Sequence, residues 1–385
     1  MAYFRKRSGK WSYTVDIGTD PLTGKRKQRT KSGFLTKKAA QLEAARIEQE
    51  ISDGLYVNES SKYFQQIAEE WFEFYKLKVK ISSARIREKE MNHLIKAFKH
   101  LKIRSITKKN YLEFIHHLAN QYKPNYVSGI HTTGKMIFQY AIDSGYIKVN
   151  PSDRIELPKP KIDIESLESQ TGEIKFLEKE ELARFLKTAY SEGLEMDYLA
   201  FSTLSYTGLR IGELLALKWT DIDFKARTLR VTKTLYNPNN NQQNYELLSP
   251  KTNGSIRTIK IDEQLLELLA KHNVLQTTHK LRHKKYYHDN GFIFARENGH
   301  PQLRKVFDTR LKRLLKKAHI TKNITPHSFR HTHTSLLIEA GVGIKEIQQR
   351  LGHSDIQTTM NIYAHMTNNM DEMASQKFSL LMKNL

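Results

Sequence analysis

The chain has 385 residues and a formal net charge of +22, and it contains no cysteine. A chain of this length exceeds what one ordinary hydrophobic core supports, so two or three domains are expected. The absence of cysteine excludes disulfides, thiolate catalysis and cysteine-ligated zinc. The positive charge favours a polyanionic partner, of which nucleic acid is the first candidate, over a basic protein without such a partner.

Positive charge is concentrated at the N-terminus, where residues 1–40 hold eleven Lys and Arg against two Asp. Apolar and polar residues alternate over 11–17, which predicts a strand, and a return strand follows over 25–32. Thr36 then caps a predicted helix over 37–53. A small basic sheet with one helix suits DNA binding because a β-ribbon fits the major groove. The alternative is a small domain with a solvated basic face.

The N-terminal sequence MAYFRKRSGKWSY lacks the apolar run of a signal peptide. No run of 18 or more apolar residues occurs in the chain, so no membrane span is expected. These two observations predict an intracellular protein.

Residues 62–150 show helical periodicity instead. Helices are predicted over 64–75, 83–100, 107–122 and 124–144. Pro124 suits the first turn of the last helix, and Gly145 suits its end. The polar faces are rich in Lys, Arg and His, which either meet phosphates or are solvated. Residues 151–173 carry three Pro without periodicity and are predicted to be a linker.

Residues 174–385 form the largest predicted unit, with mixed helices and strands. DYLAFSTLSYTG reads as a helix stopped by Gly208, and Arg210 stands at the start of the next helix, RIGELLALKW. The segments IDFKARTLRVTKTLY, YELLSPK and SIRTIKI predict one β-hairpin sheet. From about Glu263 onward the chain is predicted to be helical, apart from GFIFA and its turn.

Six polar side chains in this unit are the residue types that a charged oxyanion centre needs: Arg210, Lys251, His327, Arg330, His353 and Tyr363. Arginine guanidinium groups hold phosphate oxygens in bidentate fashion. A tyrosine hydroxyl has an ordinary pKa of about 10, so it attacks a phosphate only where fixed cations hold the phosphate charge. The set therefore predicts transfer of a DNA strand to Tyr363.

Four motifs carry a resemblance: TGLRIGELLALKW, PKTNGSIRTIKI, TPHSFRHTHTSLLIEAG and LGHSDIQTTMNIYAH. In this order the chain resembles the tyrosine recombinase (phage integrase) family across residues 174–365. The resemblance implies Arg210, Lys251, His327 with Arg330, and His353 as the family's catalytic positions, and Tyr363 as its nucleophile. Glu213 resembles the family's structural acid beside Arg210.

The resemblance implies a multidomain α+β protein. Residues 1–56 are similar to an arm-type DNA-binding domain with a three-stranded sheet and a helix, and residues 62–150 to a helical core-type DNA-binding domain. It implies a site-specific integrase of a phage or other mobile element, rather than a housekeeping resolvase. Binding of core and arm sites on double-stranded DNA and a homo-tetramer on that DNA are further expectations.

The family resemblance also sets expectations about cofactors and surroundings. No cofactor and no metal are expected, because the guanidinium groups supply the positive charge. An excisionase and a host DNA-bending protein are possible partners, and the place of action is the cytoplasm of a bacterial host, at the nucleoid. The tail 366–385 either caps its own domain or exchanges between protomers.

Alternatives remain open on the residues alone. A lone tyrosine in QTTMNIYAH usually serves packing, and PKTNG is a good turn by itself. His327 and His331 stand four apart as in some zinc sites, although no HExxH glutamate accompanies them. GVGIKEIQQRLG resembles the recognition helix of a DNA-binding regulator. The rival functions are therefore a non-enzymatic regulator, a metal-dependent nuclease and a relaxase or type IB topoisomerase.

Overall fold

The computed structural model describes residues 2–19, 24–53, 62–158, 176–241, 243–250 and 255–352, together with the single residues Met360 and Met382. The chain divides into two compact units, Met1–Asp163 and Ile164–Leu385. Lys251, His353 and Tyr363 lie outside the described residues, as do 159–173 of the predicted linker. Of the helices in the described ranges, none has the length and apolar character needed to span a bilayer.

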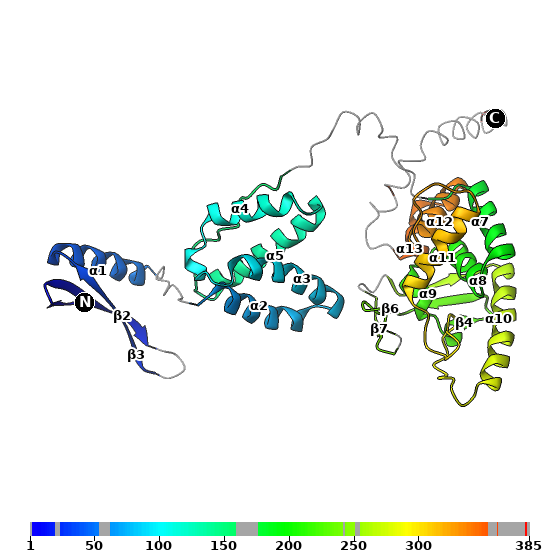
Figure 1. Ribbon diagram of the computed structural model, residues 1–385, viewed down its shortest axis with the longest axis horizontal. Helices are drawn as coiled ribbons and strands as arrows, with labels where there is room; N and C mark the ends of the chain where they lie inside the picture. Colours follow the sequence, from blue (N-terminus) through cyan, green and yellow to red (C-terminus); the bar gives the residue numbers. More distant parts are fainter. Residues whose placement is uncertain are drawn as a thin grey trace. The chain divides into compact units, whose positions relative to one another are not determined.

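The N-terminal part is a three-stranded antiparallel sheet with one helix against it (Figure 1). The elements are β1 (Tyr3–Arg7), β2 (Lys10–Thr19), β3 (Arg26–Phe34) and α1 (Lys37–Ser52). Tyr13 and Val15 alternate to one face of β2 and are buried in a cluster with Ala40 and Ala44 of α1. The Thr36 side chain accepts a hydrogen bond from the Ala39 amide and so caps α1, as predicted. Strand β1 has no clear period in the sequence, and only the family resemblance predicts it.

The helical part of the first unit contains the four helices that periodicity predicts. They are α2 (Phe64–Lys78), α3 (Ile81–Phe98), α4 (Lys108–Ala119) and α5 (Pro124–Asp143), with a short 3-10 turn over Ile103–Ser105. Pro124 stands in the first turn of α5, and Gly145 follows that helix with φ of 70°. Ile155 and Leu157, within the predicted linker, pack against the helical core.

The second unit is mainly helical. Its helices are α7 (Lys179–Glu192), α8 (Asp197–Thr207), α9 (Ile211–Ala216), α10 (Glu263–Arg282), α11 (Arg304–Lys317), α12 (Ser328–Glu339) and α13 (Ile344–Leu351). Phe185, Phe201 and Phe329 are fully buried, and the Phe201 and Phe329 rings stack with centroids 5.4 Å apart. This aromatic contact fixes α12 against α8.

Helix α9 is shorter than RIGELLALKW predicted. It ends at Ala216, and a 3-10 turn over Trp219–Asp221 follows. The Trp219 amide donates to the carbonyl of Gly291, and the Ile293 amide donates to the carbonyl of Leu217. These bonds to a distant segment satisfy backbone groups that a longer helix would have paired within itself.

The strands form two sheets instead of the single one predicted (Figure 1). The three-stranded sheet contains β4 (Ile222–Asp223), β5 (Thr228–Val231) and β8 (Arg257–Lys260), and a separate ribbon contains β6 (Thr234–Tyr236) and β7 (Glu246–Leu248). Between β5 and β6 the Lys233 ammonium lies 2.6 Å from both carboxylate oxygens of Asp221. This ion pair holds the chain where it leaves the first sheet.

Candidate active site

Arg210 stands at the turn between α8 and α9. Gly208 ends α8 in the left-handed region, with φ of 64°, and Arg210 becomes the N-cap of α9. The Arg210 amide donates to one carboxylate oxygen of Glu213 at 2.9 Å, and its guanidinium donates to the other at 3.0 Å. The Arg210 side chain is 41% exposed whereas that of Glu213 is 5% exposed. Glu213 therefore anchors Arg210 from beneath while its guanidinium remains accessible.

Arg330 lies on the first turn of α12 and is 1% exposed. Its guanidinium donates to the carbonyl of Gly208 at 2.8 Å and to that of Leu351 at 2.6 Å. Burial first, and then the nearby charge of Arg210, lower the pKa of Arg330 to about 9. The group still carries its charge at neutral pH, so a second fixed cation lies close to Arg210.

His327 is the N-cap of α12 and is exposed to solvent. Its ring meets that of His331 edge to face at 4.9 Å. Partial loss of water around the ring lowers the pKa of His327 to about 4, with further contributions from His331, Arg330 and Arg210. The imidazole is thus neutral at pH 7 in the free protein and is able to accept a proton.

Beneath these groups lies a layer of supporting contacts. His333 is buried, and its Nδ1 lies 2.8 Å from the carbonyl of Ser205 while its Nε2 accepts from the Arg350 guanidinium at 3.1 Å. Burial, and then the charge of Arg350, lower the pKa of His333 to about 4. Within the described ranges, no cluster of three His, Asp or Glu able to hold a metal ion occurs.

Sequence reasoning missed Arg257 and Arg350. Arg257 pairs with Glu213 through its two terminal guanidinium nitrogens, Nη2 at 2.8 Å and Nη1 at 3.2 Å. Burial alone would raise the pKa of Glu213, but the Arg257 and Arg210 contacts outweigh it and hold that pKa below its ordinary value. Arg257 lies within the motif PKTNGSIRTIKI, so the motif could have marked it as a candidate residue. Nothing in the sequence indicates that it pairs with Glu213.

The structure brings together Arg210, His327 and Arg330 of the six predicted residues. The carbonyl of Gly208 joins the Arg210 turn to Arg330, and the charges of both arginines act on His327. Lys251, His353 and Tyr363 are outside the described residues, so their positions stay predictions. Two guanidinium groups beside a neutral imidazole are suited to binding a phosphodiester and moving a proton.

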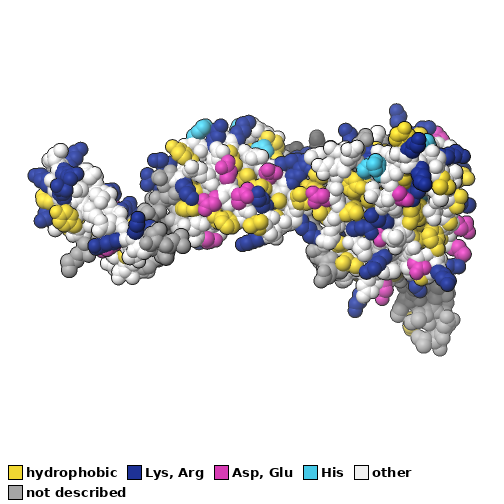
Figure 2. Space-filling model, turned by 90° about the horizontal axis from the view of Figure 1, so that it is seen from below, with side chains coloured by type: hydrophobic (Ala, Val, Ile, Leu, Met, Phe, Trp, Pro, Cys, Tyr) yellow, Lys and Arg dark blue, Asp and Glu magenta, His cyan; other side chains and the backbone are white. Residues whose placement is uncertain are grey.

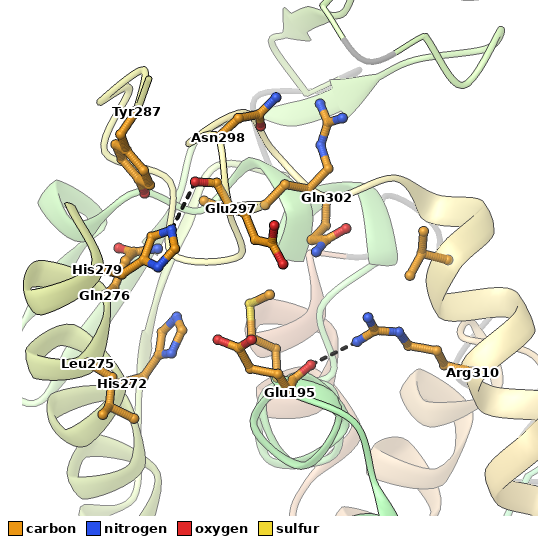
Figure 3. Close-up of a pocket in the computed structure, with 14 residues that line it drawn as sticks. Glu195, His272, Leu275, Gln276, His279, Tyr287, Glu297, Asn298, Gln302 and Arg310 are labelled. Atoms are coloured by element: carbon orange, nitrogen blue, oxygen red, sulfur yellow. Dashed lines mark hydrogen bonds between the residues drawn. The ribbon is translucent and has the colours of Figure 1, made fainter. Parts of the chain in front are cut away.

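A cavity of about 570 Å³ lies elsewhere in this unit, between α10, α11 and the segment around Glu297 (Figure 3). There the His279 ring lies 3.0 Å from the carbonyl of Glu297, and Arg310 donates to the carbonyl of Glu195. Arg210, His327 and Arg330 do not line this cavity. The group of Arg210, His327 and Arg330, and not the cavity, is therefore the candidate active site.

Lys and Arg side chains are scattered over the face displayed in Figure 2, consistent with 63 Lys and Arg against 41 Asp and Glu in the chain. Such a surface attracts the phosphates of nucleic acid. Charge on this scale is suited to binding a polyanion, whereas the pair of Arg210 and Arg330 is suited to holding one phosphate.

The Phage integrase family matches residues 175–370, just over half of the chain. The chain belongs to the phage integrase family. Two further family models match the N-terminal part of this integrase: an Arm DNA-binding domain over residues 1–51 and a Phage integrase central domain over residues 64–157. The predicted resemblance to integrases with an N-terminal arm domain is confirmed, and the protein binds DNA.

Curated relatives match nearly the whole integrase. The prophage ps2 probable integrase of Lactococcus lactis is 32% identical over 94% of this chain and 95% of its own length. The ICEBs1 integrase of Bacillus subtilis is 28% identical over 99% of this chain and its entire length. The protein is thus a tyrosine-type site-specific recombinase, of the kind that integrates and excises mobile elements. A regulator without enzymatic activity and a metal-dependent nuclease are therefore no longer rival functions for this chain.

Solved structures support the predicted multidomain α+β fold. The Tn1549 transposon integrase bound to transposon right end DNA superposes with a TM-score of 0.64 at 24% identity, covering 83% of this chain and all of that one. A lambda integrase tetramer bound to a Holliday junction gives 0.56 at 17% identity, covering 94% of each chain. At these identities the comparison speaks for the fold alone.

Proposed function

We propose that the catalytic site of this integrase is formed by six side chains: Arg210, Lys251, His327, Arg330, His353 and Tyr363. The observation that carries the proposal is the position of Arg330. Its guanidinium donates to the carbonyl of Gly208, two residues before Arg210, and to the carbonyl of Leu351, two residues before His353. A buried cation bonded to both segments supports the convergence of these motifs on one phosphate.

In the proposed cleavage step, the Tyr363 oxygen attacks the phosphorus and the bond to the 5′-oxygen breaks. Arg210 and Arg330 hold the non-bridging oxygens, and His353 donates a further hydrogen bond to them. His327, neutral in the free protein, accepts the tyrosine proton. The Lys251 ammonium protonates the leaving 5′-oxygen, so the products are a 3′-phosphotyrosine and a free 5′-hydroxyl.

The rejoining step reverses these transfers on a new partner strand. A 5′-hydroxyl gives its proton to Lys251 and attacks the phosphotyrosine, and His327 returns a proton to the departing Tyr363 oxygen. The number of phosphodiester bonds is unchanged, so no ATP is consumed. The guanidinium groups supply the positive charge, and we therefore propose a reaction without metal ion or cofactor.

The assembly we propose is a homo-tetramer on two duplexes. Residues 1–56 bind arm sites and residues 62–150 bind core sites of double-stranded DNA, joined to the catalytic residues 174–385 by the segment 151–173. The tetramer in this proposal follows the lambda integrase, which has the same fold and was solved as a tetramer bound to a Holliday junction. An excisionase and a host DNA-bending protein are the proposed accessory partners, in the cytoplasm at the bacterial nucleoid.

The test of the active site uses a nicked suicide substrate that traps protein on DNA. Tyr363→Phe is expected to abolish the covalent adduct while binding of the same DNA is unchanged. The control Tyr190→Phe alters a tyrosine that is 75% exposed and is expected to react normally. A covalent adduct formed by the Tyr363→Phe protein would refute the assignment. Loss of the wild-type reaction in a chelator would refute the metal-free mechanism.

A further inference from the structure

A buried ion pair ties the sheet of β4, β5 and β8 to the Arg210 turn. Arg257 on β8 and Glu213 on α9 each have side chains that are 5% exposed, and they meet through two hydrogen bonds. Glu213 uses the same two oxygens for the Arg210 amide and guanidinium. A planar guanidinium is needed for such a bidentate contact, because an ammonium presents only a point charge.

The third nitrogen of Arg257 reaches a different element. Its Nε donates to the carbonyl of Arg350 at 2.8 Å, on the last turn of α13. The next carbonyl along the chain, that of Leu351, accepts from Arg330 at 2.6 Å. Carbonyls of the last helical turn have no partners within the helix, so two buried arginines satisfy successive carbonyls at this end.

Helix α13 ends two residues before the LGH histidine, His353, in the sequence. Gly352 ends the helix in the left-handed region, with φ of 66°, and its amide bonds back to Gln348. The backbone of Gly352, the residue before His353 in the sequence, is therefore held by the last turn of α13. That turn is held by Arg257 on one side and Arg330 on the other.

We infer that Arg257 is a positioning residue of the recombination reaction: it orients the end of α13, and through it His353, relative to Arg210. The inference rests on the proposed role of His353. Arg257 touches neither substrate nor the reacting atoms in this scheme. It joins Glu213, which anchors Arg210, to the carbonyl that precedes the LGH segment, so one guanidinium sets the spacing between two phosphate-binding groups.

Arg257 also lies close in sequence to the proposed general acid Lys251. Arg257 begins β8, and the segment between β7 and β8 contains the predicted general acid Lys251. Arg257 also donates to the carbonyl of Ser255, the first described residue after Lys251. A single buried side chain thus contacts Glu213, which holds Arg210, and described residues that lie close in sequence to positions 251 and 353.

The first experiment measures hydrogen exchange in the full-length protein. Arg257→Gln is expected to raise exchange at least about tenfold in a peptide covering 344–352, because the last turn of α13 loses a partner. The matched control is Arg227→Gln, which removes an exposed arginine paired with Glu263 near the same sheet. Unchanged exchange over 344–352 in the Arg257→Gln protein overturns the inference without reference to activity.

The second experiment measures the rate of covalent adduct formation on a nicked substrate. Arg257→Gln is expected to slow cleavage by about 10²-fold, the scale of a small misplacement of reacting groups, with DNA affinity changed less than threefold. Arg257→Lys keeps the charge without the bidentate contact, so it is expected to remain slow. A fully active Arg257→Lys protein overturns the geometric argument.

A double-mutant cycle separates this inference from the proposed function. If Arg257 acts through His353, its substitution has little further effect once His353 is alanine. Cleavage by His353→Ala at the wild-type rate would refute the proposed role of His353 itself. If His353→Ala slows cleavage, and Arg257→Gln then slows the His353→Ala protein by the same factor as it slows the wild-type protein, the positioning role alone is overturned.

Discussion

Arg330 and Leu351 are joined by a hydrogen bond of 2.6 Å from a buried guanidinium to a main-chain carbonyl, across 21 residues of chain. The same guanidinium donates to the carbonyl of Gly208, 122 residues away in sequence. A side chain proposed to hold phosphate therefore also holds two segments of protein. Catalysis and stability are linked at this position, and substitutions there are expected to affect both.

Substitution of Arg330 by lysine is expected to weaken both contacts, because an ammonium cannot follow the planar geometry of the two carbonyls. We expect a loss of about 2–3 kcal/mol in the free energy of unfolding, as for hydrogen bonds of a charged donor. Cleavage of a nicked substrate is expected to fall at least about 10²-fold. Chemical denaturation and single-turnover assays measure the two effects, and a stable but inactive protein would separate the two roles.

The pH dependence of cleavage should reflect His327. Its pKa of about 4 in the free protein means that the neutral, proton-accepting form prevails at pH 6 and above. The second-order rate of adduct formation is therefore expected to be insensitive to His327 near neutrality and to fall only below about pH 5. His327→Gln should lower the rate at neutral pH and remove this acid limb.

The pH profile needs a stability control, because a depressed histidine pKa also destabilises the fold in acid. The unfolded chain binds a proton at an ordinary pKa of about 6.5, whereas the folded chain binds it only near 4, so stability is full above pH 6.5 and declines toward pH 4. Melting at each pH identifies the range in which the protein stays folded. An acid limb centred near pH 6.5 in folded protein would contradict the assignment.

Gly208→Ala tests the close packing under the active site. A methyl group at this position would lie 2.6 Å from Cδ2 of Leu351 and 2.7 Å from Cδ2 of His333, in a backbone with φ of 64°. Gly291 is the matched control, because its φ is 72° and nothing lies within 4 Å of such a methyl group. We expect about 1–2 kcal/mol of destabilisation from the backbone at Gly291, and about 1–3 kcal/mol more at Gly208.

The Gly208 comparison has an enzymatic readout as well. Displacement of Leu351 shifts the carbonyl that Arg330 holds, so the Gly208→Ala protein is expected to cleave slowly even under conditions in which it is folded. The Gly291→Ala protein is expected to cleave at the wild-type rate. If the two variants are equally destabilised and cleave at equal rates, Leu351 and His333 move away from the added methyl group without loss of folding free energy.

Asp197 presents a buried charge remote from the active site. It is fully buried at the start of α8, and its two oxygens accept from Arg310 and Arg313 of α11 at 3.0 Å each. Asp197→Ala is expected to destabilise the catalytic unit by about 3–5 kcal/mol, because it leaves two partly buried cations without their partner. Asp308→Ala, on the same helix α11, removes an exposed carboxylate from Arg304 and is expected to cost under about 1 kcal/mol. Denaturation of the full chain compares them.

Much of the local structure could be predicted from short stretches of sequence. Thr36 and Pro124 indicate where helices begin, and Gly208 indicates where one ends, because capping and backbone preferences act over a few residues. Prediction failed where backbone groups form hydrogen bonds with backbone groups of a segment distant in the sequence. Helix α9 ends early because Gly291 and Ile293 take its hydrogen bonds, and periodicity carries no information about that pairing.

By itself, the sequence determined the family, the order of the three parts and the residue types able to hold a phosphate and attack it, since these depend on motifs and composition. Only the tertiary structure decided that Arg330 holds Gly208 and Leu351 together, and that Arg257 connects Glu213 to the end of α13. The physical reason is that a buried guanidinium must find acceptors for its donors wherever the fold supplies them. Those acceptors lie between 21 and 122 residues away along the chain.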